Sequence, residues 1–160
     1  MLTSNEGDRG RFELRRALAS LGYQEVVNYS FVAEEWESDF GGNAKPVRLA
    51  NPIAAHMSVM RTTLLGGLVQ TLRANLNRGE ARVRVFEVGR CFEAASPSLA
   101  VQPERVAGLA FGSRWPEQWA EKGAGVDFYD AKGDVEVLAG NRALEFLALG
   151  FDGVHRRYRT

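Results

Sequence analysis

Apolar side chains recur at helical spacing in two separate stretches of the chain. Residues 9–21 carry Phe12, Leu14, Ala17, Leu18 and Leu21, and residues 63–77 carry Leu65, Leu68, Leu72 and Leu76. This spacing places each set on one face of a helix. Gly22 and Gly79 follow the two stretches, and glycine often ends a helix in the left-handed conformation. The sequence therefore predicts two amphipathic helices, each closed by a glycine.

Alternating apolar and polar residues predict strands. Residues 24–32 alternate, with Val27, Tyr29 and Phe31 on one face, which predicts a half-buried strand directly after the first helix. Residues 105–112 predict a second strand. Further short strands are expected at residues 46–50, 126–129 and 144–149, helices at 34–40 and 130–138, and a loop at 96–103.

The strand predicted at residues 82–93 has two distinct faces and leads into a turn. Val83 and Val85 fall on one side, and Arg84, Phe86 and Val88 fall on the other. Since helices and strands do not alternate regularly along the chain, the fold class that we expect is α+β. We predict a mainly antiparallel sheet flanked by helices, with residues 1–8 as a flexible lead-in and residues 9–160 as a single domain.

Composition limits the kinds of protein that fit this pattern. The chain has 160 residues, 45% of them hydrophobic, and a formal net charge of zero, so nothing global favours nonspecific binding to nucleic acid or membrane. No run of about 18 apolar residues is present, so no membrane span is predicted, and the first residues lack the core of a signal peptide. Cys91 is the only cysteine, which excludes an intrachain disulfide and favours a reducing cytoplasm.

Candidate metal and nucleophile sites have little support in the sequence. His56, His155 and Cys91 lack partners at ligand spacing, so no metal or nucleophilic site is predicted, and Cys91 is expected to be a buried thiol. Carboxylates gather at Asp127, Asp130, Asp134 and Glu136. They have the chemistry to hold Mg²⁺, but acidic residues stabilising the positive end of a helix are the favoured interpretation.

Four aromatic residues also lie close together in the sequence. Trp115, Trp119, Phe128 and Tyr129 have the flat rings that stack on bases or on an adenine. No basic patch accompanies them, so packing in a core or an interface is favoured over stacking on a ligand.

Three segments resemble, in order, the core of class II aminoacyl-tRNA synthetases. The helix ending at Gly22 with the strand after it is similar to the first motif of that family, residues 60–65 to the stretch before the second motif, and residues 85–93 to the second motif. Two positions depart from the pattern. Tyr29 stands where catalytic members have a proline, and Glu93 stands where they have the ATP-binding arginine.

The second departure changes the expected chemistry. In an active site of this class the arginine neutralises the α-phosphate as adenylate forms, whereas a carboxylate repels a polyphosphate. The swing is of order several kcal/mol at a few ångströms. Arg90, three residues upstream of Glu93 on a strand, is expected to point to the opposite face and so cannot replace the lost charge.

A wider set of phrases is similar to the β subunits of bacterial phenylalanyl-tRNA synthetases and covers nearly all of residues 10–138; it includes residues 25–31, 49–53, 58–62, 75–78 and 128–136. The resemblance implies a module that has kept a catalyst's fold without its active site, and hence no catalytic, cofactor-binding or metal-binding residue in this chain. It further implies an α₂β₂ assembly in which the α subunit joins phenylalanine to tRNA(Phe) with ATP and Mg²⁺.

The same resemblance implies that Phe12, Leu14, Leu18 and Leu21 form part of the subunit interface, although an amphipathic helix that faces only its own sheet has the same pattern. The chain lacks the other domains of a full β subunit, so we expect it to be an excised piece. Two further hypotheses stay open, which are a stand-alone class II paralogue that binds or activates an amino acid or nucleotide, and an RNA-binding module.

Overall fold

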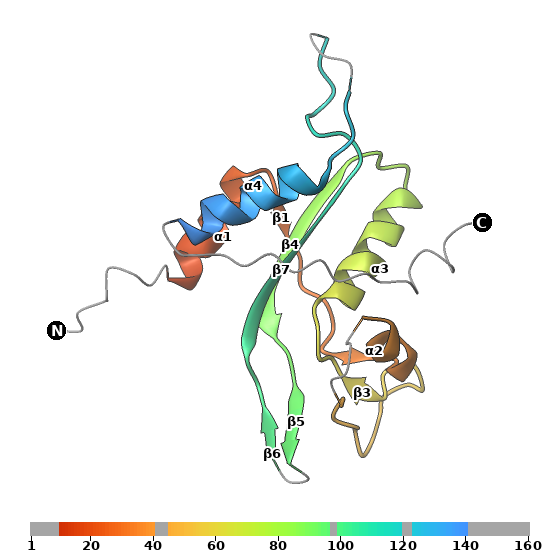
Figure 1. The fold of residues 1–160 in the computed structure, drawn as a ribbon. Coiled ribbons are helices and arrows are strands. Elements are labelled where there is room, and N and C mark those ends of the chain that lie inside the picture. The colour runs from red at the N-terminus through yellow and green to blue at the C-terminus, as the bar shows by residue number, and fades with distance from the viewer. Residues whose placement is uncertain (1–9, 41–44, 97–98, 120–122, 141–160) are drawn as a thin grey trace, which may run out of the picture.

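The fold is built around one central strand, β4 (Val83–Arg90), in a three-stranded sheet of order β1–β4–β7 (Figure 1). The short β1 (Gln24–Glu25) runs parallel to β4, and β7 (Glu104–Phe111) runs antiparallel along its whole length. The computed structural model describes residues 10–40, 45–96, 99–119 and 123–140.

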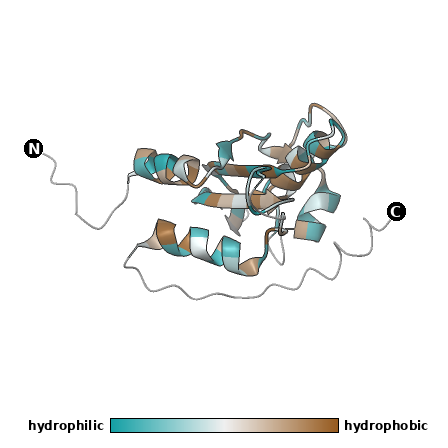
Figure 2. Ribbon diagram, turned by 90° about the horizontal axis from the view of Figure 1, so that it is seen from above, coloured by the Kyte–Doolittle hydropathy of each residue, from teal (hydrophilic) through white to brown (hydrophobic). Residues whose placement is uncertain are grey.

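Both faces of β4 are covered, and each face belongs to its own core cluster. On one face, Phe86 and Val88 pack with Leu18 of α1 (Arg11–Ser20) and Leu138 of α4 (Phe128–Ala139). On the other face, Val83 and Val85 pack with Leu68 of α3 (Leu65–Leu76). Figure 2 shows the strands in the middle of the molecule with helices on either side. The two faces predicted for this strand are confirmed.

The two predicted amphipathic helices are confirmed as α1 and α3, and each ends at its predicted glycine. Gly22 has φ 83° and Gly79 has φ 88°, the left-handed conformation that glycine adopts without steric cost. After α1, the N–H of Tyr23 donates to the carbonyl of Leu18 at 3.1 Å, and after α3 the N–H of Glu80 donates to that of Asn75 at 3.1 Å. Both ends are therefore Schellman motifs.

Two further sheets of two strands each lie at one end of the molecule (Figure 1). β2 (Phe31–Val32) pairs antiparallel with β3 (Val59–Met60), and β5 (Glu93–Ser96) pairs antiparallel with β6 (Leu99–Val101). The predicted helix at residues 34–40 is α2 (Glu34–Phe40), with Phe40 buried and Trp36 half-buried. The α+β class with a mainly antiparallel sheet is confirmed, since only the β1–β4 pair is parallel among the described strands.

Several local predictions are wrong. The strand expected over residues 24–32 is interrupted between β1 and β2, and Val27 and Tyr29 are 90% and 74% exposed rather than half-buried. The loop expected at 96–103 contains β6 and the last residue of β5, and the strand expected at 126–129 is absent because α4 begins at Phe128. Residues 46–50 contribute an isolated bridge between Arg48 and Val59, not a strand. The predictions for residues 1–8 and 144–149 lie outside the described residues.

The pair of glycines in α3 approaches neighbouring side chains. A Cβ on Gly66 would lie 2.9 Å from the ring of Trp36, and a Cβ on Gly67 would lie 2.8 Å from Cβ of Asn28. These contacts bring α3 close to α2 and to the chain between β1 and β2. None of the helices in the described part of the chain has the length and apolar character needed to cross a membrane.

Candidate functional site

The position that resembles the catalytic arginine of the second motif lies at the start of β5. Glu93 there forms an ion pair with Arg105 of β7, and its side chain is 36% exposed. Arg90, at the end of β4, donates from Nη1 to Oε1 of Gln102 at 3.3 Å. The carboxylate at this position is thus balanced by a cation of the chain itself.

The two residues between β4 and β5 keep the pairing register of the β4–β7 ladder, since Arg90 pairs with Glu104 and Glu93 pairs with Val101. The N–H of Cys91 donates to the carbonyl of Pro103 at 3.0 Å, and the N–H of Phe92 donates to the carbonyl of Arg61 at 2.8 Å. The two N–H groups thus point to opposite edges of the chain, as in a regular inner strand, and the opposite orientation of Arg90 and Glu93 stays a prediction. Cys91 is fully buried, as predicted, and burial raises the pKa of its thiol.

Close to this junction lies a buried ion pair that sequence reasoning missed. Nη1 of Arg61 lies 2.6 Å from Oε1 of Glu87, and their side chains are 6% and 3% exposed. Nε of Arg61 also donates to the carbonyl of Arg90 at 3.0 Å. Gly89 makes room for the guanidinium, because a Cβ there would lie 2.4 Å from Nη2 of Arg61.

Asn28 completes this buried cluster from the chain between β1 and β2. Its Nδ2 donates to Oε2 of Glu87 at 2.8 Å, and its Oδ1 accepts from the hydroxyl of Thr71 at 3.0 Å. The nearby buried carboxylate of Glu37 accepts from both the N–H and the hydroxyl of Thr62. Since a buried charge is tolerated only when it is paired and hydrogen-bonded, these groups are structural.

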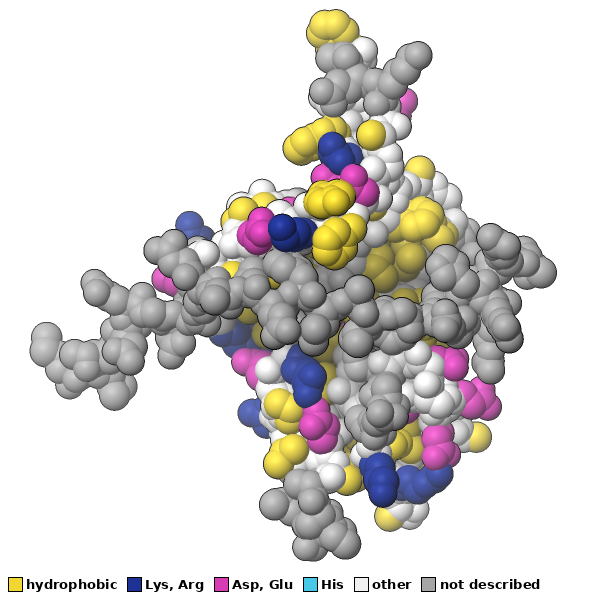
Figure 3. Space-filling view, viewed as in Figure 1, with side chains coloured by type: hydrophobic (Ala, Val, Ile, Leu, Met, Phe, Trp, Pro, Cys, Tyr) yellow, Lys and Arg dark blue, Asp and Glu magenta, His cyan; other side chains and the backbone are white. Residues whose placement is uncertain are grey.

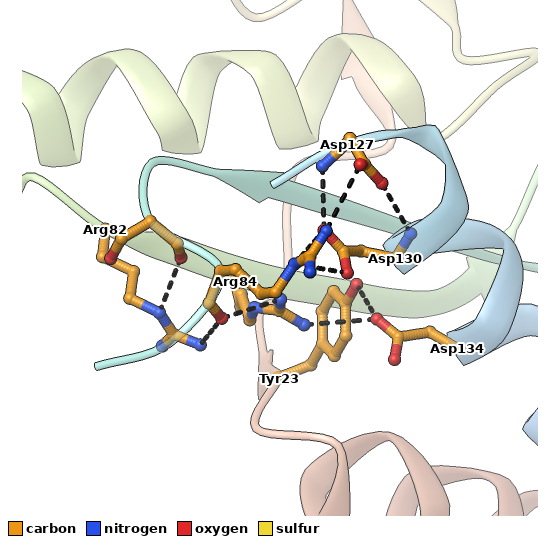
Figure 4. A network of polar contacts seen from close by, with 8 residues as sticks. Tyr23, Arg82, Arg84, Asp127, Asp130 and Asp134 are labelled. Atoms are coloured by element: carbon orange, nitrogen blue, oxygen red, sulfur yellow. Dashed lines mark hydrogen bonds and ion pairs between the residues drawn. The ribbon is translucent and has the colours of Figure 1, made fainter. Parts of the chain in front are cut away.

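A second polar network joins α4 to the sheet (Figure 4). The hydroxyl of Tyr23 donates to Oδ2 of Asp134 at 2.7 Å, and Nη1 of Arg84 lies 3.2 Å from the same oxygen. The guanidinium of Arg84 lies 5.4 Å from the centre of the Tyr23 ring. Burial, followed by the hydrogen bond to Asp134 and the charge of that carboxylate, raises the pKa of Tyr23 to about 12.

The N-terminus of α4 is closed by a capping box of two carboxylates. The side chain of Asp127 accepts from the N–H of Asp130 at 3.0 Å, and that of Asp130 accepts from the N–H of Asp127 at 2.9 Å. Arg114 donates to both carboxylates. The backbone hydrogen bond from Asp127, and then the bond from Arg114, lower the pKa of Asp130.

The four carboxylates considered as Mg²⁺ ligands therefore all have partners within the chain. Asp127 and Asp130 cap α4, Asp134 binds Tyr23 and Arg84, and Glu136 lies 3.2 Å from the ammonium of Lys132. This arrangement agrees with the favoured interpretation, in which acidic residues stabilise the helix N-terminus.

The proposed interface stripe on α1 is mostly part of the domain's own core. Leu18 is 4% exposed, and Leu14 and Leu21 pack against the same cluster. Phe12, in contrast, is 71% exposed. For the three leucines this burial favours the alternative, in which the stripe faces its own sheet, and it leaves Phe12 accessible to a partner.

The aromatic residues near α4 are exposed, so packing in the core is not their role. Trp115 and Trp119 are 56% and 99% exposed, and Phe128 and Tyr129 are 60% and 76% exposed. Figure 3 shows hydrophobic side chains gathered where the projecting chain between β7 and α4 meets that helix. An interface or a stacking surface is what this exposure leaves for them.

Comparison with known proteins agrees with the resemblance seen in the sequence. The family model described as "Phenylalanyl tRNA synthetase beta chain CLM domain" matches residues 3–151. The "Phenylalanine--tRNA ligase beta subunit" of Neisseria meningitidis serogroup A / serotype 4A is 51% identical over 155 residues, which is 97% of this chain and 20% of the relative. The protein of the same name from Chromobacterium violaceum is 55% identical over 138 residues, 86% of this chain and 18% of the relative.

Each of these relatives is a subunit of a tRNA ligase. The chain belongs to the phenylalanyl-tRNA synthetase beta chain CLM domain family. It spans about a fifth of the length of the curated relatives that it matches. Among solved structures, a pyrrolysyl tRNA synthetase of Desulfitobacterium hafniense matches with a TM-score of 0.46 and 18% identity, covering 66% of this chain and 38% of that one.

Proposed function

We propose that the chain is the non-catalytic, synthetase-like module of a phenylalanine–tRNA ligase β subunit. In this proposal it supports assembly with an α subunit, which charges tRNA(Phe) with phenylalanine in the cytoplasm using ATP and Mg²⁺. The observation that carries the proposal is the ion pair between Glu93 and Arg105, at the position where the resemblance places the ATP-binding arginine.

The residues around Glu93 do not fit a triphosphate. A polyphosphate needs uncommitted cations, but Arg105 is paired with Glu93 and Arg61 is buried with Glu87. Placing a phosphate beside Glu93 would set like charges against each other, which raises the free energy of the bound state. No step of adenylate formation is therefore assigned to this chain.

Support for a role in assembly comes from apolar side chains that the described residues do not cover. Val27, Tyr29 and Phe12 are 90%, 74% and 71% exposed. Exposed apolar side chains of this kind mark surfaces that are buried in an assembly, because their burial removes apolar area from water. The residues that we assign to assembly are therefore these three rather than the leucines of α1.

The test is the melting temperature of the purified protein with and without millimolar ATP and Mg²⁺. A ligand that binds only the folded state raises the melting temperature, so a scaffold shows no shift. A rise of several degrees would instead support the stand-alone paralogue that activates an amino acid or nucleotide. The same measurement on Glu93→Arg tests whether the negative charge at this position, rather than the rest of the fold, prevents ATP binding.

We expect Glu93→Arg to gain at most weak ATP binding and no pyrophosphate exchange, since one arginine restores charge but not a catalytic site. Pyrophosphate exchange by this variant would contradict the proposal. Binding of tRNA by the chain alone, with an affinity that falls steeply as salt is raised, would support the RNA-binding module instead.

A further inference from the structure

Building on the proposed assembly, we propose that Asn28 is a positioning residue for subunit association. Together with the buried pair Arg61–Glu87, it holds residues 26–29 in an extended shape that presents Val27 and Tyr29 to the α subunit. Asn28 does so from inside the molecule, without touching the partner.

Residues 27–29 lie between two stretches of ordinary strand pairing. On the β1 side, the N–H of Val26 donates to the carbonyl of Phe86 at 2.8 Å. On the β2 side, the carbonyl of Ser30 accepts from the N–H of Arg61 at 2.9 Å. Between these bonds the chain is not part of a strand, so the backbone N–H and carbonyl of Asn28 need other partners.

The buried ion pair supplies those partners. The N–H of Asn28 donates to Oε1 of Glu87 at 3.4 Å, and the carbonyl of Asn28 accepts from Nη1 of Arg61 at 3.5 Å. One carboxylate and one guanidinium thus bind the donor and the acceptor that a neighbouring strand would otherwise bind. Arg61 and Glu87 take the place of a strand at this point.

The side chain of Asn28 fixes which face of the segment points outward. It lies between Glu87 and Thr71, with hydrogen bonds of 2.8 and 3.0 Å. Gly67 permits this approach, since a Cβ there would lie 2.8 Å from Cβ of Asn28. Successive side chains of an extended chain point in opposite directions. Inward Asn28 therefore places Val27 and Tyr29 outward, where they are 90% and 74% exposed.

The partner that this surface fits is an unlike subunit with an apolar contact surface. Val27 and Tyr29 carry no charge, so the surface they make is complementary to an apolar one. The relatives of this chain are named beta subunits, which implies an unlike partner in the assembly. Because the segment is held extended before binding, less conformational entropy is lost when the partner docks.

The test uses the longest natural form of the subunit and the α subunit of the same organism. Asn28→Asp replaces the donor facing Glu87 with an oxygen, and the double variant Asn28→Asp with Glu87→Gln restores one donor and one acceptor. Asn75→Asp is the matched control, because Asn75 is a half-buried asparagine of α3 whose side chain donates to the carbonyl of Thr71 in the same helix. Three quantities are measured, namely the dissociation constant, the melting temperature and amide hydrogen exchange at residues 27–29.

We expect Asn28→Asp to weaken association about tenfold or more and to speed exchange at residues 27–29, with the double variant recovering both. Asn75→Asp should lower the melting temperature without either change. Val27→Ser and Tyr29→Ser test the surface itself and should weaken association without faster exchange.

Two results would overturn the inference. In the first, exchange at residues 27–29 rises in Asn28→Asp while the affinity for the α subunit stays the same. In the second, Asn75→Asp weakens association as much as Asn28→Asp does, so that general destabilisation explains both. If Val27→Ser and Tyr29→Ser leave association unchanged, or if the chain binds only a second copy of itself, the proposed assembly surface fails instead.

Discussion

Tyr23 shows how one hydroxyl makes the fold sensitive to alkaline pH. Tyr23 is 7% exposed and its hydroxyl has the carboxylate of Asp134 as acceptor, so ionisation would place two negative charges together in a buried site. The folded state therefore holds the phenolic proton more tightly than the unfolded chain does. The pKa of Tyr23 rises from 10.0 to about 12 for this reason.

We predict that Tyr23→Phe removes part of the alkaline loss of stability. A raised pKa in the folded state contributes stability that is complete below pH 10 and is lost as pH rises toward 12. At pH 7 the variant should be less stable by about 1 kcal/mol, because Asp134 loses a donor. The wild-type protein should lose this advantage by pH 11.

Urea denaturation at pH 7, 9.5 and 11 measures the effect, with Tyr129→Phe as the control because Tyr129 is 76% exposed. A difference in unfolding free energy between wild type and Tyr23→Phe that stays constant with pH would contradict the prediction.

At the residue scale the sequence predicted which residues alternate but not which face turns inward. Val27 and Tyr29 were expected to be partly buried because they are apolar, yet Asn28 is the residue that points into the molecule. The reason is that Glu87 and Thr71, the partners of Asn28, lie far along the chain. A local pattern contains no information about a partner that distant in sequence.

Among the elements, α3 contains two glycines, although glycine is a poor helix former. Alanine is the better helix former by up to about 1 kcal/mol. A Cβ added to Gly66 or Gly67, however, would lie closer to Trp36 or Asn28 than real Cβ atoms lie to their neighbours. Contact between elements therefore outweighs helix propensity at these positions.

We predict that Gly67→Ala destabilises the protein by about 1–3 kcal/mol, because the new Cβ would overlap Asn28 and displace it from Glu87. Gly133→Ala is the matched control in α4, where a Cβ would meet nothing within 4 Å. There the same change should stabilise by about 0.5–1 kcal/mol. Thermal or urea unfolding of the two variants measures both effects.

If Gly67→Ala proved as stabilising as Gly133→Ala, the close approach of α3 to Asn28 would not exist in solution.

At this scale the long helices and their glycine ends were predictable, because spacing and capping are local properties. The start of α4 was not, since Val126, Phe128 and Tyr129 favour a strand until Asp127 and Asp130 are seen to form a capping box. The β5–β6 hairpin was missed because its pairing is set by the adjacent β4–β7 ladder.

For the whole molecule, we expect folding and assembly to depend on different residues of the same helix. Leu18 belongs to the core beneath α1, whereas Phe12 lies on its surface. We predict that Leu18→Asp abolishes cooperative unfolding or costs more than about 4 kcal/mol, because an unpaired charge is buried. Phe12→Asp should leave the melting temperature within a few degrees of wild type and weaken association with the α subunit.

Circular dichroism melting and size-exclusion chromatography with the α subunit separate the two effects. If Leu18→Asp stayed folded and lost only association, α1 would belong to the interface as first expected from the resemblance. The spacing predicted which residues form the apolar face of α1. It did not predict which surface covers that face, because the same pattern fits the domain's own sheet or another subunit.

The position of β4 between β1 and β7 also sets an order in time. Only a short segment of chain separates Arg90 from its partner Glu104 in the β4–β7 ladder. Pairing Gln24 with Val85 requires a much longer loop to close. During synthesis, α1 and β1 leave the ribosome well before the strand that they pack against. We therefore expect the first third of the chain to wait, with Leu18 and Tyr23 unprotected, until β4 has emerged, which makes this early segment the part most exposed to chaperones and proteases.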